Sequence, residues 1–237
     1  MRGVRRVLPL LATLAGIALF MRLGWWQYTK ALQAEAAVAL HAQRSHLPPA
    51  TLDGRLVQAS LAEAARFTVH GRYDAAQQFF IDNRQEHGVP GVHVITPLKI
   101  DGSETRLLVN RGWVGWPQGR GVLPQVPVPE GPVQVTGTAQ APSTKRPFLM
   151  PDRPEPSQRL WARVDLERYA AGTQQVVQPV LLLQDAGDAA DGLVRNWPAP
   201  EDRSVKHRGY AWQWFGMAAA LLLFHVVSAW RGRARPA

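Results

Sequence analysis

Two long apolar segments lie near opposite ends of this 237-residue chain, and they constrain its fold more than any other feature. The segment Tyr210–Trp230 contains no charged residue, and as a helix it would rise roughly 31 Å, enough to cross a bilayer. The segment Val7–Met21 is also apolar, and the aromatic residues just beyond it lengthen the span. We therefore predict an α+β membrane protein with transmembrane helices at residues 7–28 and 207–230.

The basic residues of the chain predict how these spans are oriented. The net charge is +9, and six arginines flank the apolar segments: Arg2, Arg5, Arg6, Arg231, Arg233 and Arg235. The rest of the chain carries only about +3, which does not indicate nucleic acid as a partner. By the positive-inside rule, residues 1–6 and 231–237 are cytoplasmic and residues 29–206 form an extracytoplasmic domain. In a bacterium this is a multi-pass inner (plasma) membrane protein with a periplasmic domain; in a mitochondrion the domain faces the intermembrane space.

A cleaved signal peptide is the alternative interpretation of the first apolar segment, because it too begins with arginines. The nearest small-x-small pattern, Ala34–Ala36, lies too far beyond the apolar stretch to serve as its cleavage site. We therefore expect a retained anchor.

The extracytoplasmic domain has the pattern of a helical extension followed by short strands. Residues 27–45 contain no glycine or proline and should continue the first helix. Strand-like segments, most of them bounded by turn-forming residues, then follow at 66–73, 78–84, 92–100, 106–114, 133–139, 161–164 and 180–184. Asp101-Gly102 predicts a hairpin, and Asp165 should cap a short helix at 165–171. We predict an antiparallel sheet that curls or closes into a partly open barrel.

No catalytic pattern is present in the sequence. The chain has no cysteine, which excludes thiol chemistry and cysteine-ligated zinc. It also lacks the G-x-S-x-G, H-E-x-x-H, Walker and G-x-G-x-x-G motifs. We therefore expect a binding or assembly protein rather than an enzyme.

The candidate site lies where the second apolar segment begins, at the outer membrane boundary. Both segments contribute residues to it: Gly24, Trp26, Gln27, His207, Tyr210 and Trp214. A neutral histidine is a good axial ligand for haem iron, and aromatic side chains suit the macrocycle. The same residue types also gather at membrane interfaces because they are amphipathic, so the spacing alone leaves both interpretations open. His225 lies five turns beyond His207 on the same face, where interfacial placement or helix pairing is expected.

Four short motifs, in order along the chain, carry a family resemblance. Leu23–Gln27 matches L-G-x-W-Q, and Pro90–Leu98 matches P-G-x-x-V-x-T-P-L. Val109–Val114 matches V-N-R-G-W-V, and His207–Phe215 matches H-x-x-Y-A-x-x-W-F. Together they resemble the surfeit locus protein 1 family, which are cytochrome c oxidase assembly factors. The chain departs from the family pattern at two places, with Gly115 in place of a frequent proline and Val205-Lys206 in place of Asn-Asn before the histidine.

The resemblance implies a membrane factor that binds haem a transiently and aids its insertion or retention in subunit I of a terminal oxidase. It implies that His207 is the iron ligand and that the neighbouring candidate residues line the haem. Subunit I, haem A synthase and membrane lipid are the implied partners. Asn110, Arg111 and Trp113 of the third motif either build the sheet or face the oxidase. The alternative function is a haem-free membrane chaperone that stabilises an oxidase assembly intermediate.

Overall fold

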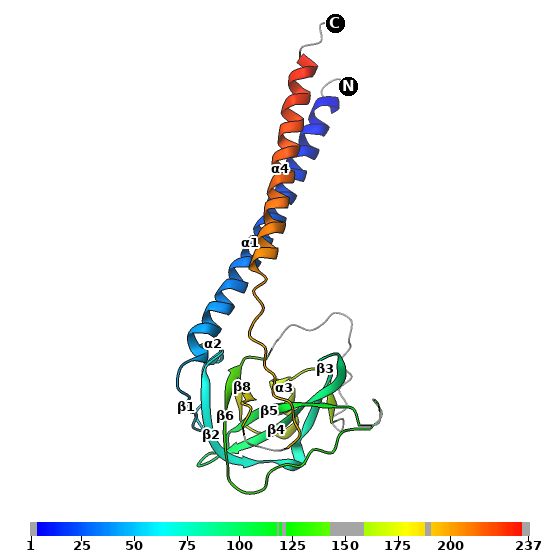
Figure 1. The fold of residues 1–237 in the computed structure, drawn as a ribbon. Helices are drawn as coiled ribbons and strands as arrows, with labels where there is room; N and C mark the ends of the chain where they lie inside the picture. The colour runs from blue at the N-terminus through cyan, green and yellow to red at the C-terminus, as the bar shows by residue number, and fades with distance from the viewer. Residues whose placement is uncertain (1–3, 118, 120–121, 143–158, 188–190, 234–237) are drawn as a thin grey trace. The chain divides into compact units, whose positions relative to one another are not determined.

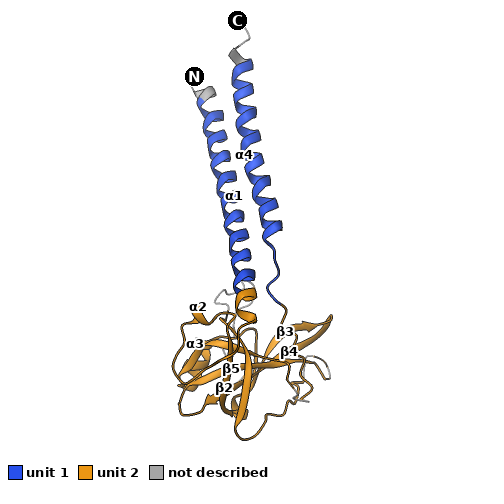
Figure 2. Cartoon of the chain, turned by 60° about the vertical axis from the view of Figure 1, so that its left-hand side comes forward, with its two compact units in different colours: residues 1–40, 199–237 blue, residues 41–198 orange. Residues whose placement is uncertain are grey.

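The computed structural model describes residues 4–117, 119, 122–142, 159–187 and 191–233 (Figure 1). The chain divides into two compact units (Figure 2). Residues 1–40 and 199–237 form the first unit, which consists of two long helices, and residues 41–198 form the second, which holds all the strands. We call these units the helix pair and the β-domain.

Helices α1 (Val4–Ser45) and α4 (Ser204–Arg233) contain 42 and 30 residues. Helix α1 continues without a break to Ser45, as predicted from the absence of glycine and proline in its second half. Both helices are long and apolar enough to cross a membrane, and little of their apolar surface is buried within the protein. So much exposed apolar surface indicates membrane association. The predicted arrangement, two apolar helices flanking a β-rich domain, is confirmed.

Five strands of the β-domain close into a barrel, each pairing with the next around the ring. In order around the barrel they are β2 (Arg66–Tyr73), β6 (Val133–Gln140), β8 (Val177–Gln184), β5 (Arg106–Gly115) and β4 (Val89–Ile100). The ring closes where β2 pairs with β4, and Gly71 lies at that junction. A Cβ on Gly71 would lie 2.2 Å from the backbone oxygen of Lys99, so only glycine permits this approach.

Three further strands extend the sheet beyond the barrel. Strand β3 (Phe79–Glu86) pairs with β4, while β1 (Ala50–Thr51) and β7 (Leu160–Trp161) each contribute two residues. The seven predicted strands are all present with boundaries within three residues, and β1 was not predicted. The Asp101-Gly102 hairpin joins β4 to β5, with Gly102 at a φ of +72°.

The sheet is mixed rather than purely antiparallel, which corrects one detail of the prediction. Strands β5 and β8 pair in parallel, as do β1 with β2 and β3 with β7. Parallel neighbours need a long connection that returns the chain to the same end of the sheet. The 61 residues between Gly115 and Val177 provide that connection for β5 and β8.

Both faces of β5 are covered, so its side chains alternate between two apolar clusters. Leu107 and Val109 pack in one cluster with Leu182 of β8. Leu108 packs in another cluster with Tyr169 of α3 (Leu166–Thr173). As predicted, Asp165 caps α3: its carboxylate accepts a hydrogen bond from the backbone N–H of Arg168 at 3.0 Å.

Candidate functional site

The two long helices pack side by side in antiparallel register. Three contacts show the antiparallel order: Thr13 contacts His225, Phe20 contacts Trp214, and Gln27 contacts His207. As the residue number increases along α1, the number of its partner on α4 decreases. Small residues line the surfaces that face each other: Gly16, Gly24, Ala31, Ala211 and Ala218. Small residues let helix backbones approach closely, as is typical of helix packing in membranes.

Gly24 makes the closest approach between the two helices near the candidate site. A Cβ at Gly24 would lie 2.4 Å from ring carbon Cε1 of Phe215. On α4, Ala211 is only 2% exposed. Ala211 therefore packs in the contact between the two helices.

His207 forms a hydrogen bond across this contact. Its Nδ1 lies 2.8 Å from Oε1 of Gln27, and the His207 side chain is half-buried. Because an amide oxygen only accepts hydrogen bonds, this contact places the imidazole proton on Nδ1. Nε2 then carries the lone pair that a metal ligand needs. The Nδ1 hydrogen bond fixes the orientation of the ring, as in most metal-binding histidines.

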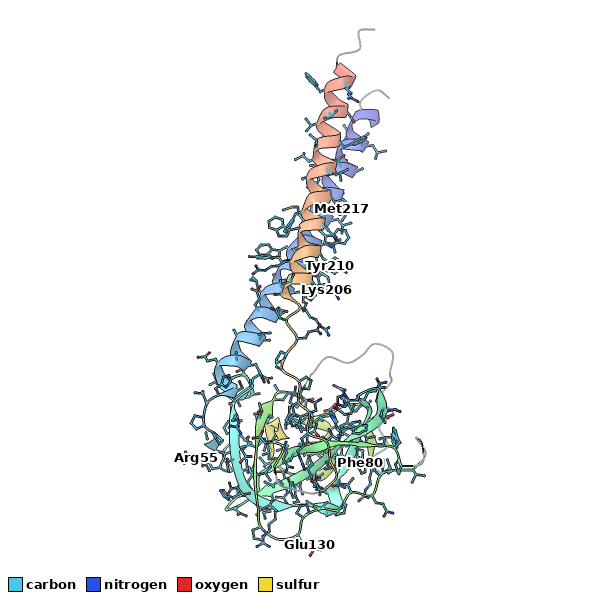
Figure 3. All side chains as sticks on the ribbon, viewed as in Figure 1. Arg55, Phe80, Glu130, Lys206, Tyr210 and Met217 are labelled. Carbon is cyan, nitrogen blue, oxygen red and sulfur yellow. The ribbon has the colours of Figure 1, made fainter. Side chains whose placement is uncertain are left out.

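The six candidate residues separate into two groups. Gly24 and Gln27 lie in the helix contact with His207, and Trp214 is half-buried with its ring centroid 5.8 Å from that of Phe20. Trp26 and Tyr210 are instead 52% and 46% exposed. Figure 3 labels Tyr210 on α4. In a bilayer these two aromatic side chains would face lipid or a bound ligand.

His225 repeats the His207 arrangement near the other end of the helix pair. Its Nδ1 lies 3.1 Å from the hydroxyl oxygen of Thr13. Each helical histidine on this face of α4 therefore has a polar partner on α1. The His225 contact agrees with the helix-pairing interpretation of the sequence.

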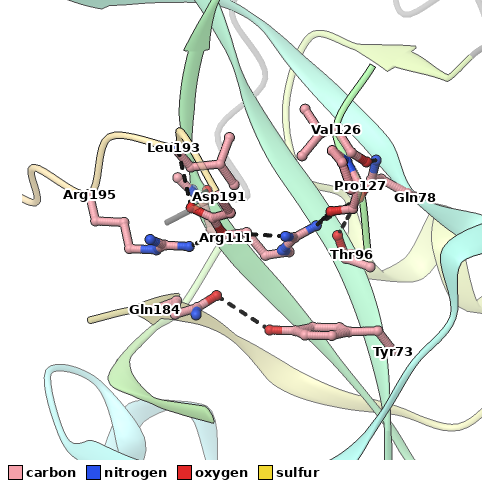
Figure 4. Close-up of polar contacts among 12 residues, drawn as sticks. Tyr73, Gln78, Thr96, Arg111, Val126, Pro127, Gln184, Asp191, Leu193 and Arg195 are labelled. Carbon is pink, nitrogen blue, oxygen red and sulfur yellow. Dashed lines mark hydrogen bonds and ion pairs between the residues drawn. The ribbon is translucent and has the colours of Figure 1, made fainter. Parts of the chain in front are cut away.

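A second polar cluster lies in the β-domain around Arg111, which is 1% exposed (Figure 4). Its Nη1 donates to Oε1 of Gln78 at 3.2 Å and to the backbone oxygen of Pro127 at 3.0 Å. Its Nη2 lies 3.4 Å from Oδ2 of Asp191, and the same oxygen pairs with Arg195. Burial lowers the pKa of Arg111 from its usual value, and Asp191 opposes part of that shift.

The SURF1 family profile matches residues 14–219, which include most of α1, about half of α4 and the whole β-domain. The chain belongs to the SURF1 family. This confirms the resemblance carried by the four sequence motifs.

Two relatives of this SURF1-family chain show how far the similarity extends. Surfeit locus protein 1 of Takifugu rubripes is 25% identical over 176 residues, which cover 68% of this chain and 72% of that protein. Surfeit locus protein 1 of Xenopus tropicalis is 29% identical over 132 residues, covering 55% of this chain. The second alignment spans only 41% of the Xenopus protein.

The V-N-R-G-W-V motif of this SURF1-family chain builds the sheet. Asn110 and Arg111 are 3% and 1% exposed, and both side chains form hydrogen bonds within the β-domain. Trp113 is half-buried and packs across Gly91 of the neighbouring strand. A Cβ at Gly91 would lie 2.6 Å from Nε1 of Trp113. Burial supports a structural role for Asn110 and Arg111, and the partner-facing role of Asn110, Arg111 and Trp113 stays a prediction.

Asn110 also contacts a half-buried histidine that the sequence did not single out. Its Nδ2 donates to Nδ1 of His93 at 3.1 Å. Burial, with a smaller contribution from Arg84, lowers the pKa of His93 to about 4, so its ring is neutral at physiological pH. Within the described ranges, His, Asp and Glu side chains do not gather in threes that could hold a metal ion.

Sequence reasoning also missed Asp191 and Arg195, the acidic and basic partners in the Arg111 cluster. Asp191 lies 80 positions after Arg111, in a connection without strand or helix periodicity. Only the folded chain brings these residues together.

Proposed function

We propose that this protein is a membrane-bound assembly factor for a haem–copper terminal oxidase, and that it binds haem a transiently through His207. The observation that carries the proposal is the hydrogen bond from Nδ1 of His207 to Gln27, which leaves Nε2 as the coordinating nitrogen. Family membership supports the assembly role. As an assembly factor the protein would act by binding, not by catalysis.

The residues around His207 fit an apolar, planar cargo. The imidazole is half-buried, and the exposed rings of Trp26 and Tyr210 lie on helix surfaces that would face lipid. Haem a carries the redox-active iron that the oxidase requires. A single histidine ligand would hold it less tightly than a pair of histidines in the oxidase, so release to subunit I would be favourable.

Membrane topology is part of the proposal. We infer that both termini are cytoplasmic, that the β-domain is periplasmic in the bacterial inner membrane, and that subunit I and haem A synthase are partners. The chain has no cysteine, so a single Arg55→Cys variant gives one reactive site on the β-domain, where the Arg55 side chain is 93% exposed. A membrane-impermeant maleimide added to spheroplasts should label it. Labelling only after the cells are lysed would contradict the periplasmic placement.

The ligand assignment is tested by haem content. The full chain is expressed in cells that make haem A, purified in mild detergent, and examined by reduced-minus-oxidised spectra. We expect a haem a signal that is lost in His207→Ala. The matched control is His225→Ala, which removes the other helical histidine on the same face and should keep the signal. Equal haem content in His207→Ala and the unmodified protein would refute the assignment.

Gln27→Leu tests the orienting hydrogen bond separately. Loss of a residue that positions a metal ligand typically weakens metal binding about 10–100-fold. We therefore expect lower haem occupancy at limiting haem A, recovering when haem A is supplied in excess.

The haem-free chaperone remains the second candidate, and one observation favours it. The Thr13–His225 contact has the same form as the Gln27–His207 contact, so both histidines could serve only to fix the register of the helices. This function predicts no haem in any variant, with subunit I still copurifying. His207→Ala and His225→Ala would then reduce that copurification to a similar extent.

A further inference from the structure

An open hollow of about 340 Å³ lies beside the Arg111 cluster of the β-domain. Its polar lining comes from Tyr73, Arg111, Gln184 and Asp191, and its apolar lining from the segment Pro127–Pro129. The volume is at the small end of the range for ligand pockets, about 300–1,000 Å³. Polar groups converging in a hollow with an apolar wall are typical of small-molecule sites.

The buried charges around this hollow do not balance. Arg111 and Arg195 have side chains 1% and 3% exposed, and both pair with the single carboxylate of Asp191. The other oxygen of Asp191 accepts from the backbone N–H of Leu193 at 3.2 Å. Among the described residues, one carboxylate therefore offsets one of the two guanidinium groups, and the cluster retains one positive charge. Within the described part of the chain, the buried Nε of Arg195 has no hydrogen-bond partner.

An uncompensated buried charge is costly, and a bound anion would offset that cost. Since the excess is a single positive charge, the matching ligand is a monoanion. A phosphate monoester carries about −1.5 to −2 at pH 7 and would overcompensate the cluster.

Two neutral side chains add donor capacity on the wall of the hollow. The hydroxyl of Tyr73 donates to Oε1 of Gln184 at 3.3 Å, which leaves the Nε2 amide of Gln184 as a donor. Burial raises the pKa of Tyr73 to about 12, so this hydroxyl keeps its proton at neutral pH. The guanidinium of Arg111 lies 5.5 Å from the centre of the Tyr73 ring.

We propose that this hollow binds a carboxylate carried on a short aliphatic chain. Nη1 of Arg111 is engaged by Gln78 and Pro127, and Nη2 by Asp191. The second N–H of Nη2 and the amide of Gln184 suit the two carboxylate oxygens, and the wall at Pro127–Pro129 suits the aliphatic part. The same chemistry is found in a free short-chain carboxylic acid and in the glutamate side chain of a partner protein. The site is independent of His207 and of haem binding.

The test uses the full chain in detergent, titrated at constant ionic strength with sodium propionate, with capped N-acetyl-glutamate amide, and with inorganic phosphate. Binding is measured as a saturable rise in the thermal unfolding temperature of the β-domain, followed by near-ultraviolet circular dichroism. We expect saturation with propionate and little response to phosphate at equal concentration. A capped-glutamate midpoint equal to that of propionate supports a protein side chain as the source, and a midpoint at least tenfold higher supports a free acid.

Two substitutions assign the binding to this hollow. Gln184→Glu keeps the side-chain shape but cancels the excess charge, so the propionate midpoint should rise at least tenfold. Tyr73→Phe removes the hydroxyl and should raise it severalfold. Gln85→Glu makes the same chemical change at an exposed position on β3 and should leave the midpoint unchanged. The proposal is overturned if the unmodified protein shows no saturable response to either carboxylate. Tighter binding of phosphate, or equal midpoints in all variants, would also overturn it.

Discussion

The helix pair exposes its large apolar side chains, whereas the β-domain buries them in its interior. On α4, Leu222 and Phe224 are 52% and 71% exposed, whereas in the barrel Leu107 and Leu182 are fully buried. The helices instead meet through glycine and alanine, with polar contacts such as Gln27–His207 between them. Lipid is as apolar as leucine, so helices in a membrane associate through close packing and a few hydrogen bonds. The β-domain is held by the burial of apolar surface from water.

The comparison predicts that a leucine-to-alanine substitution will destabilise the β-domain when it lies in the barrel but not when it lies on the exposed surface of α4. Leu107→Ala should lower the free energy of unfolding of the β-domain by about 2–5 kcal/mol, because it leaves a cavity in a fully buried cluster. Leu222→Ala removes the same atoms from an exposed helix position and should leave the β-domain unaffected. Urea unfolding of the purified protein, followed by near-ultraviolet circular dichroism, measures both. Similar losses for the two variants would contradict the comparison.

A half-buried titratable group, His93, makes the stability of the β-domain depend on pH. The pKa of His93 falls from about 6.5 in the unfolded chain to about 4 in the folded protein. Between these values the unfolded chain binds a proton that the folded protein does not, so stability declines as the pH drops from 6.5 towards 4. The loss should reach about 2–3 kcal/mol at pH 4.5.

Unfolding free energies at pH 7 and pH 4.5 measure this effect of His93. His93→Gln should remove most of it while keeping an acceptor for Asn110, which donates to the ring in the native protein. His70→Gln, at an exposed position on β2, serves as the control and should behave like the unmodified protein. An unchanged pH dependence in His93→Gln would show that another group carries it.

The close contact between the two helices can be tested by adding a side chain where the structure has glycine. A side chain at Gly24 would collide with the ring of Phe215, so Gly24→Val should weaken helix association by about 1–3 kcal/mol. Gly209→Val makes the same change on α4 where a Cβ would meet nothing within 4 Å, and should have little effect. Crosslinking of Thr13→Cys to His225→Cys by a short bis-maleimide reports the association, since the chain has no other cysteine. Adding Phe215→Ala should restore crosslinking in the Gly24→Val protein.

Local patterns in the sequence were sufficient to predict most elements of the fold. Alternation and bounding turn residues located β2 at residues 66–73, and the Asp101-Gly102 pair located the hairpin between β4 and β5. The start of β8 was placed three residues late because Pro179 was taken as its boundary. Pro179 instead lies inside β8, where the pairing with β5 shifts register, and such an irregularity can accommodate proline.

Long-range partners could not be predicted in the same way. Helical spacing placed His207 and Trp214 on one face of α4, but it could not show that Gln27 would pair with His207. Nor could it show that Trp26 and Tyr210 would be exposed, because that depends on which faces of the two helices meet. The parallel pairing of β5 with β8 likewise depends on how the long connection folds.

The smallest expected effect compares one hydrogen bond in each unit. Thr13 contacts His225 between the helices, and Thr68 contacts Thr136 across β2 and β6 at 2.9 Å. Replacing Thr13 with valine should weaken helix association by about 0.6 kcal/mol, because the freed groups find other partners within a membrane. Thr68→Val should lower the free energy of unfolding of the β-domain by about 1 kcal/mol, because it leaves the half-buried Thr136 hydroxyl without this partner. Bis-maleimide crosslinking between cysteines that replace Glu35 and Arg208, which pair between the helices at partly exposed positions, reports the first effect, and urea unfolding reports the second. A larger loss for Thr13→Val than for Thr68→Val would show that the polar contacts, rather than the close packing of small residues, dominate the helix pair.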